Sequence, residues 1–135
     1  MHLLILLSFF LGSRENPKTV NSITVEIKNI RYEKGGNIFL EICDESNHTV
    51  KKLKHLIGSK EDTIFIFTNL PFGKYAVRAF HDENNNGKLD KGVFGQPIEG
   101  WGVSNDARGF MCAPTLSKML FMHNSATKIS FKLSY

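Results

Sequence analysis

The chain has 135 residues, of which 41% are hydrophobic and eleven are phenylalanine, so it can bury the core of one domain and is too apolar to stay disordered. Its net charge of +4 is modest, and the only tight basic cluster consists of Lys51, Lys52 and Lys54. Nucleic-acid surfaces concentrate Lys and Arg around aromatic platforms. This charge distribution therefore argues against a nucleic-acid partner.

Residues 1–13 form an apolar run that is too short to span a bilayer and is typical of the core of a secretory signal peptide. The run has no preceding basic residue and no clean cleavage motif, so a buried first strand or a misplaced start codon stays an alternative. We expect a linker at residues 14–21 and a folded domain at 22–135, and hence a periplasmic or secreted protein without a stable membrane span. In such an oxidising compartment Cys43 and Cys112 could pair or stay free, and neither belongs to a CxxC motif.

The first half of the domain shows the period of two that is typical of half-buried strands. Apolar and polar residues alternate over 23–27 and again over 38–42, with a glycine-containing turn at 33–36 between them. Residues 50–57 fit either one face of a short helix or an irregular strand, and their length favours the strand.

A β-branched and aromatic run at 63–68 predicts the next strand. Pro71 fixes φ and Gly73 permits unusual backbone angles, so we expect the turn between them to pair this strand with residues 75–79 as a hairpin.

Residues 92–115 have no period and contain glycine or proline at seven positions, so they are expected to form one long irregular loop. Large apolar side chains in the loop predict that it packs over one end of the sheets rather than staying solvated. A short strand at 119–122 and a final strand at 129–133 complete about seven strands without a convincing helix. The sequence thus predicts an all-β fold, a single antiparallel β-sandwich of the immunoglobulin-like or transthyretin-like kind.

After the strand predicted at residues 75–79, oxygen-bearing side chains stand at alternate positions, Asp82, Asn84 and Asn86. Gly87 follows them and permits a sharp turn. Such spacing suits Ca²⁺, which takes six to eight oxygen ligands. An EF-hand loop would need a bidentate Glu at its twelfth position, where this chain has Val93. We therefore predict a Ca²⁺ site outside an EF-hand, with a Kd of roughly 10⁻⁴–10⁻³ M. Its ligands would be Asp82, Asn84, Asn86, Lys88 through its carbonyl oxygen, and Asp90.

The alternative to the metal site is a tight polar turn, because Asn, Asp and Gly crowd into turns without any metal. Four residues of the long loop could add an oxygen to the site or form an internal polar network that braces the loop: Glu99, Asn105, Asp106 and Arg108.

The chain resembles a bacterial family through three motifs: Leu70-Pro71-x-Gly73-x-Tyr75, Phe80-His81-Asp82-Glu83-Asn84-x-Asn86-Gly87-Lys88-Leu89-Asp90, and Phe94-Gly95-x-Pro97-x-Glu99-Gly100-x-Gly102. It is similar over about residues 20–135 to the exported proteins grouped as domain of unknown function 2141. The resemblance implies a periplasmic or secreted β-sandwich without assigned biochemistry. The chain departs from the family pattern at Met111-Cys112-Ala113, so the resemblance assigns no role to Cys112.

The favoured function is a non-catalytic exported module in which residues 82–90, the cation loop, hold the long loop of residues 92–115 in place. Alternatively, Phe94, Trp101 and Phe110 could form an aromatic platform for a carbohydrate or a peptide, including one on a cell-surface protein. Neither reading identifies the partner.

The third and weakest alternative is a secreted hydrolase. Ser104, His81 and Asp82 are residue types of a catalytic triad, but no G-x-S-x-G elbow surrounds Ser104. The sequence therefore assigns no catalytic residue.

Overall fold

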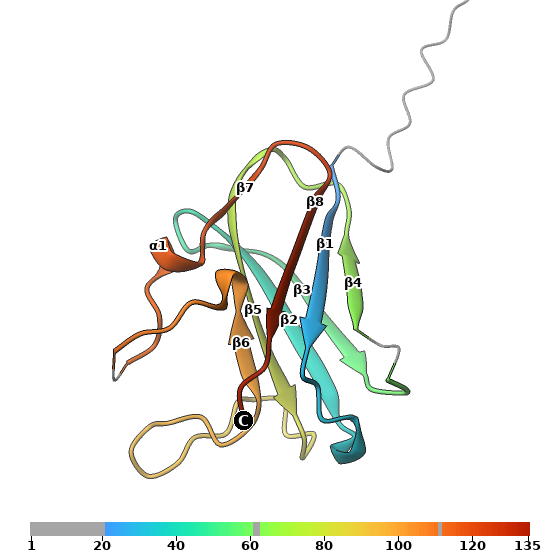
Figure 1. Cartoon of the computed structure of the whole chain (residues 1–135), viewed down its shortest axis with the longest axis vertical. Helices are drawn as coiled ribbons and strands as arrows, with labels where there is room; N and C mark the ends of the chain where they lie inside the picture. The colour runs from blue at the N-terminus through green and yellow to red at the C-terminus, as the bar shows by residue number, and fades with distance from the viewer. Residues whose placement is uncertain (1–20, 61–62, 111) are drawn as a thin grey trace, which may run out of the picture.

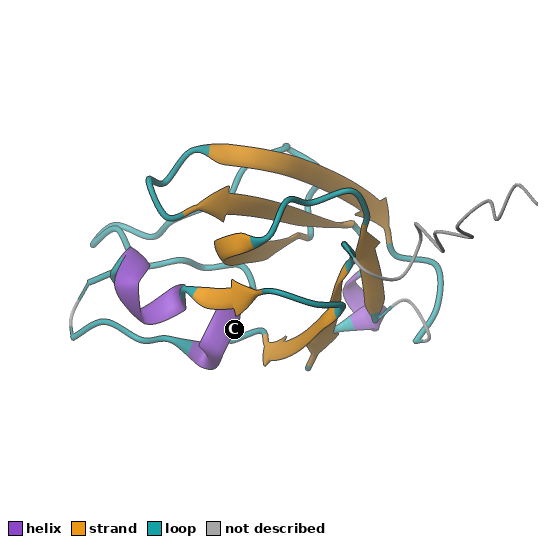
Figure 2. Ribbon diagram, turned by 90° about the horizontal axis from the view of Figure 1, so that it is seen from above, coloured by secondary structure: helices purple, strands orange, loops and turns teal. Residues whose placement is uncertain are grey.

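A computed structural model describes residues 21–60, 63–110 and 112–135 (Figure 1). The predicted signal peptide, and the predicted linker up to residue 20, lie outside the described residues. Strands are the main regular structure of the described fold, and helical turns are confined to short segments (Figure 2). This confirms the all-β prediction. The elements in chain order are β1 (Ile23–Lys28), η1 (Tyr32–Lys34), β2 (Asn37–Asp44), β3 (Thr49–Leu56), β4 (Ile64–Phe67), β5 (Gly73–Asp82), β6 (Trp101–Val103), η2 (Ser104–Asp106), α1 (Leu116–Met119), β7 (Phe121–His123) and β8 (Thr127–Lys132).

The strands form two packed sheets. One has three strands in the order β4-β1-β8, and the other has the order β3-β2-β5-β6. The short strand β7 pairs with the first three residues of β5. The pairings are antiparallel except for β1 with β8, which run parallel side by side (Figure 1). Residues 50–57, which fitted two structures in the sequence, lie mostly in β3.

The predicted hairpin between residues 63–68 and 75–79 is wrong. β4 pairs with β1 in one sheet, whereas β5 pairs with β2 in the other, so the turn carries the chain across the sandwich. The reason lies in Leu70, which is fully buried and donates its N–H to the carbonyl of Asn21 just before β1. Burying this side chain between the sheets outweighs the hairpin geometry that Pro71 and Gly73 would allow.

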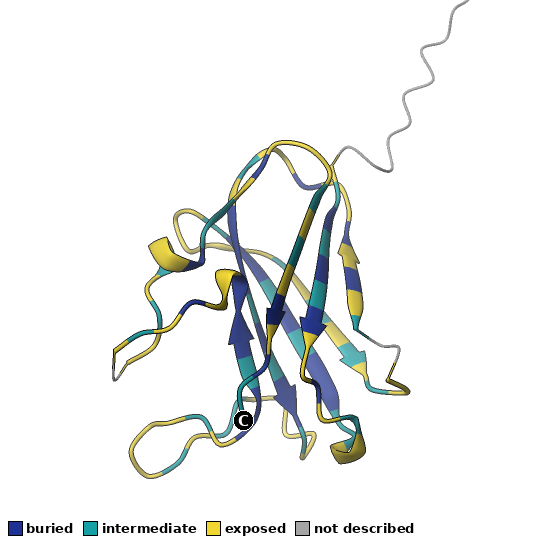
Figure 3. Cartoon of the chain, viewed as in Figure 1, coloured by how far each residue is buried: buried dark blue, intermediate teal, exposed yellow. Residues whose placement is uncertain are grey.

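The core lies between the sheets and is built from alternate residues of each strand (Figure 3). In the last strand Ile129, Phe131 and Leu133 face this core, as their alternation predicts, while the intervening residues are exposed. Within this core, the side chains of the central strands that are 0% exposed are Ile23, Val25, Ile27, Ile38, Ile42 and Val77.

The outer face of the larger sheet is also covered in part. The segment predicted as one irregular loop contains β6 and η2, and α1 follows where the sequence indicated the start of a strand. Their side chains pack against the outer positions of β2 and β5, and the members of this second cluster are Cys43, Ala76, Val103, Ala107 and Met119. The expectation that Phe94 and Phe110 pack inside is wrong, because they are 94% and 89% exposed.

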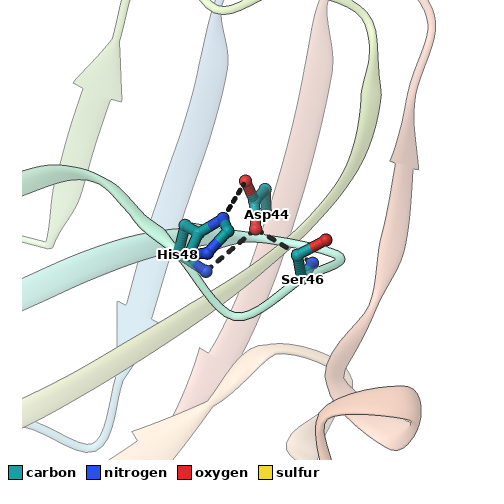
Figure 4. Close-up of polar contacts among 3 residues, drawn as sticks. All are labelled: Asp44, Ser46 and His48. Atoms are coloured by element: carbon teal, nitrogen blue, oxygen red, sulfur yellow. Dashed lines mark hydrogen bonds and ion pairs between the residues drawn. The ribbon is translucent and has the colours of Figure 1, made fainter.

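The turn between β2 and β3 is held by Asp44 (Figure 4). One carboxylate oxygen accepts the backbone N–H groups of Ser46 and His48, each at 2.9 Å, and the other lies 3.5 Å from the imidazole of His48. This turn folds back so that the side-chain oxygen of Asn47 accepts a hydrogen bond from the guanidinium of Arg78 at 2.7 Å.

Candidate functional site

The predicted cation loop begins where β5 ends, and its first carboxylate is buried. Asp82 is 1% exposed, and its two oxygens accept the backbone N–H groups of Asn86 at 3.2 Å and Gly87 at 2.8 Å. Gly87 has a φ of +79°, the left-handed geometry that lets the chain turn back over Asp82. A rigid strand therefore fixes the loop at its start.

The ends of three further side chains predicted as ligands converge on one point. The amide nitrogens of Asn84 and Asn86 lie 2.5 Å and 2.6 Å from the two carboxylate oxygens of Asp90. Hydrogen bonds from Asn86 and Asn84 are the main cause that holds the pKa of Asp90 below its usual range. The loop thus presents an ionised carboxylate opposite two side-chain amides.

Glu99, which the sequence named as a possible addition to the site or to a polar network, contacts this loop. It is 5% exposed, and its oxygens accept the backbone N–H groups of Glu83 at 2.7 Å and Asp90 at 2.9 Å. Because it bridges the two ends of the loop through backbone groups, Glu99 closes the loop.

A close backbone approach anchors the loop on its other side. A Cβ atom on Gly36 would lie 2.2 Å from the carbonyl oxygen of Asp82, so only glycine lets these two segments meet. Asn37, the next residue, donates its amide to the side-chain oxygen of Asn85 at 2.6 Å. The Gly35-Gly36 pair was interpreted from sequence as a simple turn, and its contact with the loop has no signal in a single sequence.

The other three candidates do not bond to the 82–90 loop through the hydrogen bonds described next. They are Asn105, Asp106 and Arg108. Asn105 donates to the carbonyls of Lys118 and Leu120, and Asp106 accepts the backbone N–H of Lys132. These residues fasten η2 and its surroundings to α1 and β8. The guanidinium of Arg108 lies 5.0 Å from the centre of the Trp101 ring and donates to the hydroxyl of Ser134.

The oxygen atoms of this loop are of the type that hard cations such as Ca²⁺ prefer. Within the described residues, no three His, Cys, Asp or Glu side chains are grouped as they would be in a metal centre. Any cation in this loop would therefore rely on asparagine and backbone oxygens in addition to Asp82 and Asp90, which favours weak binding.

Beside the loop, the outer face of the larger sheet carries a groove of about 840 Å³. Phe39 of β2 and Phe80 of β5 line it from the sheet, together with half-buried Trp101 of β6. Gly87 and Leu89 line it from the cation loop, so the loop forms part of its wall.

Of the three predicted platform residues, Phe94 and Trp101 line the groove, whereas Phe110 does not. Sequence reasoning missed Phe39 and Phe80. The signal was partial, because each phenylalanine stands at an outward position of its strand, whereas the neighbouring outward positions hold the charged residues Glu41 and Arg78.

The structure does not join Ser104 and His81 in a triad. The hydroxyl of Ser104 donates to the carbonyl of Met119 at 2.6 Å and accepts the N–H of Val77 at 3.0 Å. His81 Nε2 lies 2.6 Å from the carbonyl of Gly35, and Nδ1 lies 2.8 Å from the hydroxyl of Tyr135. Both side chains tie elements of the fold together.

No helix in the described part of the chain is long and apolar enough to cross a membrane. Searches of curated proteins and of solved structures found no match. The family model DUF2141, described as an uncharacterised protein conserved in bacteria, matches residues 25–130, which reach from β1 into β8 and include the cation loop and the groove. The chain therefore belongs to this bacterial family.

Proposed function

We propose that the protein is a non-catalytic, exported β-sandwich module whose 82–90 loop binds a Ca²⁺-type cation as a structural brace. The observation that supports this proposal is the convergence of Asn84, Asn86 and Asp90 beside the buried carboxylate of Asp82. Such a grouping of oxygen-bearing side chains beside a buried carboxylate is what a Ca²⁺ loop requires.

Rotating the two amides would turn the loop from a hydrogen-bonded form into a liganding form. An asparagine amide has an oxygen and a nitrogen in nearly the same positions, and the network of hydrogen bonds decides which of them faces inward. With a cation beside Asp90, the oxygens of Asn84 and Asn86 would face the ion. The carbonyl of Lys88 is the remaining predicted ligand.

The apolar run at residues 1–13 supports export, and an exported protein fits a weak site. A Kd of roughly 10⁻⁴–10⁻³ M is the range of extracellular calcium modules. Because the loop forms part of the groove wall, a bound ion would fix the shape of the groove.

The test is thermal unfolding of the protein in excess EDTA and in ~10⁻² M Ca²⁺. For a Kd of ~10⁻⁴ M, ligand linkage adds about 2.7 kcal/mol to the free energy of unfolding, which is a shift of several degrees. We expect Asp82→Asn and Asp90→Asn to abolish the calcium-dependent shift. Asp44→Asn, which changes an aspartate in the turn between β2 and β3, is the matched control and should keep the shift.

A wild-type protein that melts at the same temperature with and without calcium would reduce the loop to a polar turn. An unchanged shift in both loop variants would place the ion elsewhere. Equimolar Mg²⁺ should give a smaller shift, since Mg²⁺ demands octahedral geometry and gives up its water reluctantly.

The groove supports a second function, the binding of a carbohydrate, a peptide or another small ligand. The specific observation is that Phe39 and Phe80 stack at its sheet side with Trp101 in the neighbouring strand. Its volume of about 840 Å³ falls in the range of small-molecule sites.

A further inference from the structure

The side chains that face the groove are arranged in two rows across the larger sheet. In the first row Phe39 pairs with Lys54 on one side and with Phe80 on the other, and Phe80 pairs with Trp101. The amino group of Lys54 lies 5.6 Å from the centre of the Phe39 ring. The row therefore crosses β3, β2, β5 and β6, and its three members that line the groove, Phe39, Phe80 and Trp101, form an aromatic row.

The second row lies two residues further along β2 and β5, about 7 Å from the first because side chains on one face of a strand repeat every two residues. In it Glu41 pairs with Lys52 and with Arg78, and Arg78 pairs with Val103. The groove thus joins an apolar aromatic surface to a charged one.

Positive charge exceeds negative charge in the groove. Its lining includes the cations Lys52, Arg78 and Lys91 against the single carboxylate of Glu41. Glu41 also accepts a hydrogen bond from the hydroxyl of Thr49.

Arg78 has donors to spare. Its guanidinium donates to the sulfur of Cys43 at 3.4 Å and to the amide oxygen of Asn47, which are both neutral acceptors. Within the described residues, no carboxylate lies within ion-pair distance of it. A guanidinium has five N–H groups and suits the bidentate recognition of an oxyanion.

We propose that this groove binds a small amphipathic organic anion, with its apolar rings on the aromatic row and its carboxylate, sulfonate or phosphate against Arg78. This inference rests on the proposed binding function and specifies its ligand class. The ligand class comprises molecules with an aromatic or aliphatic part and one anionic group about 7 Å from the centre of that part, which is the spacing of the two rows. The groove volume suits one molecule of that size.

The chain contains its own reporters for this groove. Trp101 is the only tryptophan and lines the groove, so its fluorescence reports occupancy. Cys112 also lines the groove and is exposed, whereas the other cysteine, Cys43, is fully buried. A ligand in the groove should therefore slow the alkylation of Cys112.

The experiment measures how two probes bind to the protein. The probes have the same aromatic rings and differ in their charge. The anion is 8-anilinonaphthalene-1-sulfonate and its neutral counterpart is N-phenyl-1-naphthylamine. Binding is measured by energy transfer from Trp101 and by the rate of Cys112 alkylation. We expect Arg78→Gln to weaken binding of the anion about tenfold, the effect of losing a charge-assisted hydrogen bond, and to change binding of the neutral probe less than twofold.

Because Arg78 also holds the turn at Asn47, the double variant Lys52→Gln/Lys91→Gln provides an independent test on exposed side chains. It should also weaken binding of the anion selectively. Lys128→Gln, on the outer face of the other sheet, is the control and should leave both affinities unchanged.

Equal losses for both probes in the groove variants would overturn the anion preference and leave the binding function standing. A loss of the same size in Lys128→Gln would show nonspecific attraction and overturn it as well. If neither probe quenches Trp101 or protects Cys112, both the binding function and the ligand class are wrong. A protein dimer that dissociates when the probe binds would assign the groove to a second copy of the chain and overturn the proposal.

Discussion

Phe39 and Phe80 stack across the β2–β5 pair with ring centroids 4.9 Å apart and planes 5° from parallel. Both rings are half-buried on the outer face of the larger sheet, outside the main core. Neighbouring positions on the same face are covered by η2 and α1, whereas this part borders the groove. The stack therefore contributes to the fold and leaves aromatic surface available to a ligand.

We predict that Phe39→Ala and Phe80→Ala destabilise the protein non-additively. Each variant removes the same ring–ring contact. The double variant should therefore lose less unfolding free energy than the sum of the losses in the two single variants. The coupling should be about 0.5–1.5 kcal/mol, as for other aromatic pairs. The measurement is a double-mutant cycle of urea unfolding. Phe39→Ala combined with Phe67→Ala, in the other sheet, should be additive, and additivity of the Phe39–Phe80 pair would contradict the stack.

The adjacent glycines at 35 and 36 should differ sharply in their tolerance of alanine. Both have positive φ, of +61° and +80°, so alanine adds backbone strain of about 1–3 kcal/mol at each. At Gly36 the new methyl group would also lie 2.2 Å from the carbonyl oxygen of Asp82, whereas at Gly35 it meets nothing within 4 Å. Gly36→Ala should therefore cost roughly 1–3 kcal/mol more than Gly35→Ala.

Thermal unfolding of the two glycine variants measures this difference directly. If Gly36→Ala separates β2 from the cation loop, it should also reduce the calcium-dependent shift proposed for the wild-type protein. Equal costs at both positions would show that the two backbones do not meet closely.

The sequence predicted the strands better than their partners. Alternation marks the inward residues of a strand, so the positions of β1, β2, β5 and β8 could be predicted from period alone. Pairing depends on contacts between segments far apart in the chain. The turn at Pro71 has the chemistry of a hairpin, but burial of Leu70 takes the chain into the other sheet.

The residues of the candidate site could be named in part for the same reason. The proposed ligands of the cation loop are close in sequence, so their spacing was visible. Glu99 could be named as a candidate because it is a polar residue of the irregular segment. Its contacts with the backbone of the 82–90 loop could not be predicted. The groove residues Phe39, Arg78 and Phe80 come together only through the β2–β5 register, which no pattern within either strand determines.

Asp44 should make the stability of the protein depend on acid pH. The N–H of His48, the largest cause, and that of Ser46 hold the pKa of this carboxyl below its ordinary value of about 3.8. A lowered pKa in the folded state contributes stability that is present above the unfolded pKa and is lost as the pH falls through the folded one. Asp44→Asn keeps an oxygen acceptor but does not titrate.

Urea unfolding of wild type and Asp44→Asn between pH 6 and pH 2 measures this effect. The difference in midpoint between them should shrink as the pH falls. Parallel curves over the whole range would show that the turn in Figure 4 does not depend on the ionised carboxylate.

Tyr135 should produce the opposite dependence at alkaline pH. Its hydroxyl lies 2.8 Å from Nδ1 of fully buried His81 and accepts the backbone N–H of Arg31 at 3.0 Å. In the neutral form of the imidazole, an Nε2 that faces the carbonyl of Gly35 carries the proton, and the tyrosine hydroxyl then donates to Nδ1. Tyr135→Phe leaves that buried nitrogen without a donor and should cost about 1–3 kcal/mol at neutral pH.

Burial raises the pKa of Tyr135 above its ordinary value of about 10. The folded protein then keeps a proton that the unfolded chain has already lost. This stabilisation is full below the unfolded pKa and disappears as the pH rises through the folded one. Wild type should therefore lose stability faster than Tyr135→Phe above about pH 10, and the two unfolding free energies should converge. Tyr75, whose pKa burial also raises, remains in both proteins and supplies a common background. A gap between the two proteins that stays constant with pH would show that the Tyr135 hydroxyl is not held as a donor to His81.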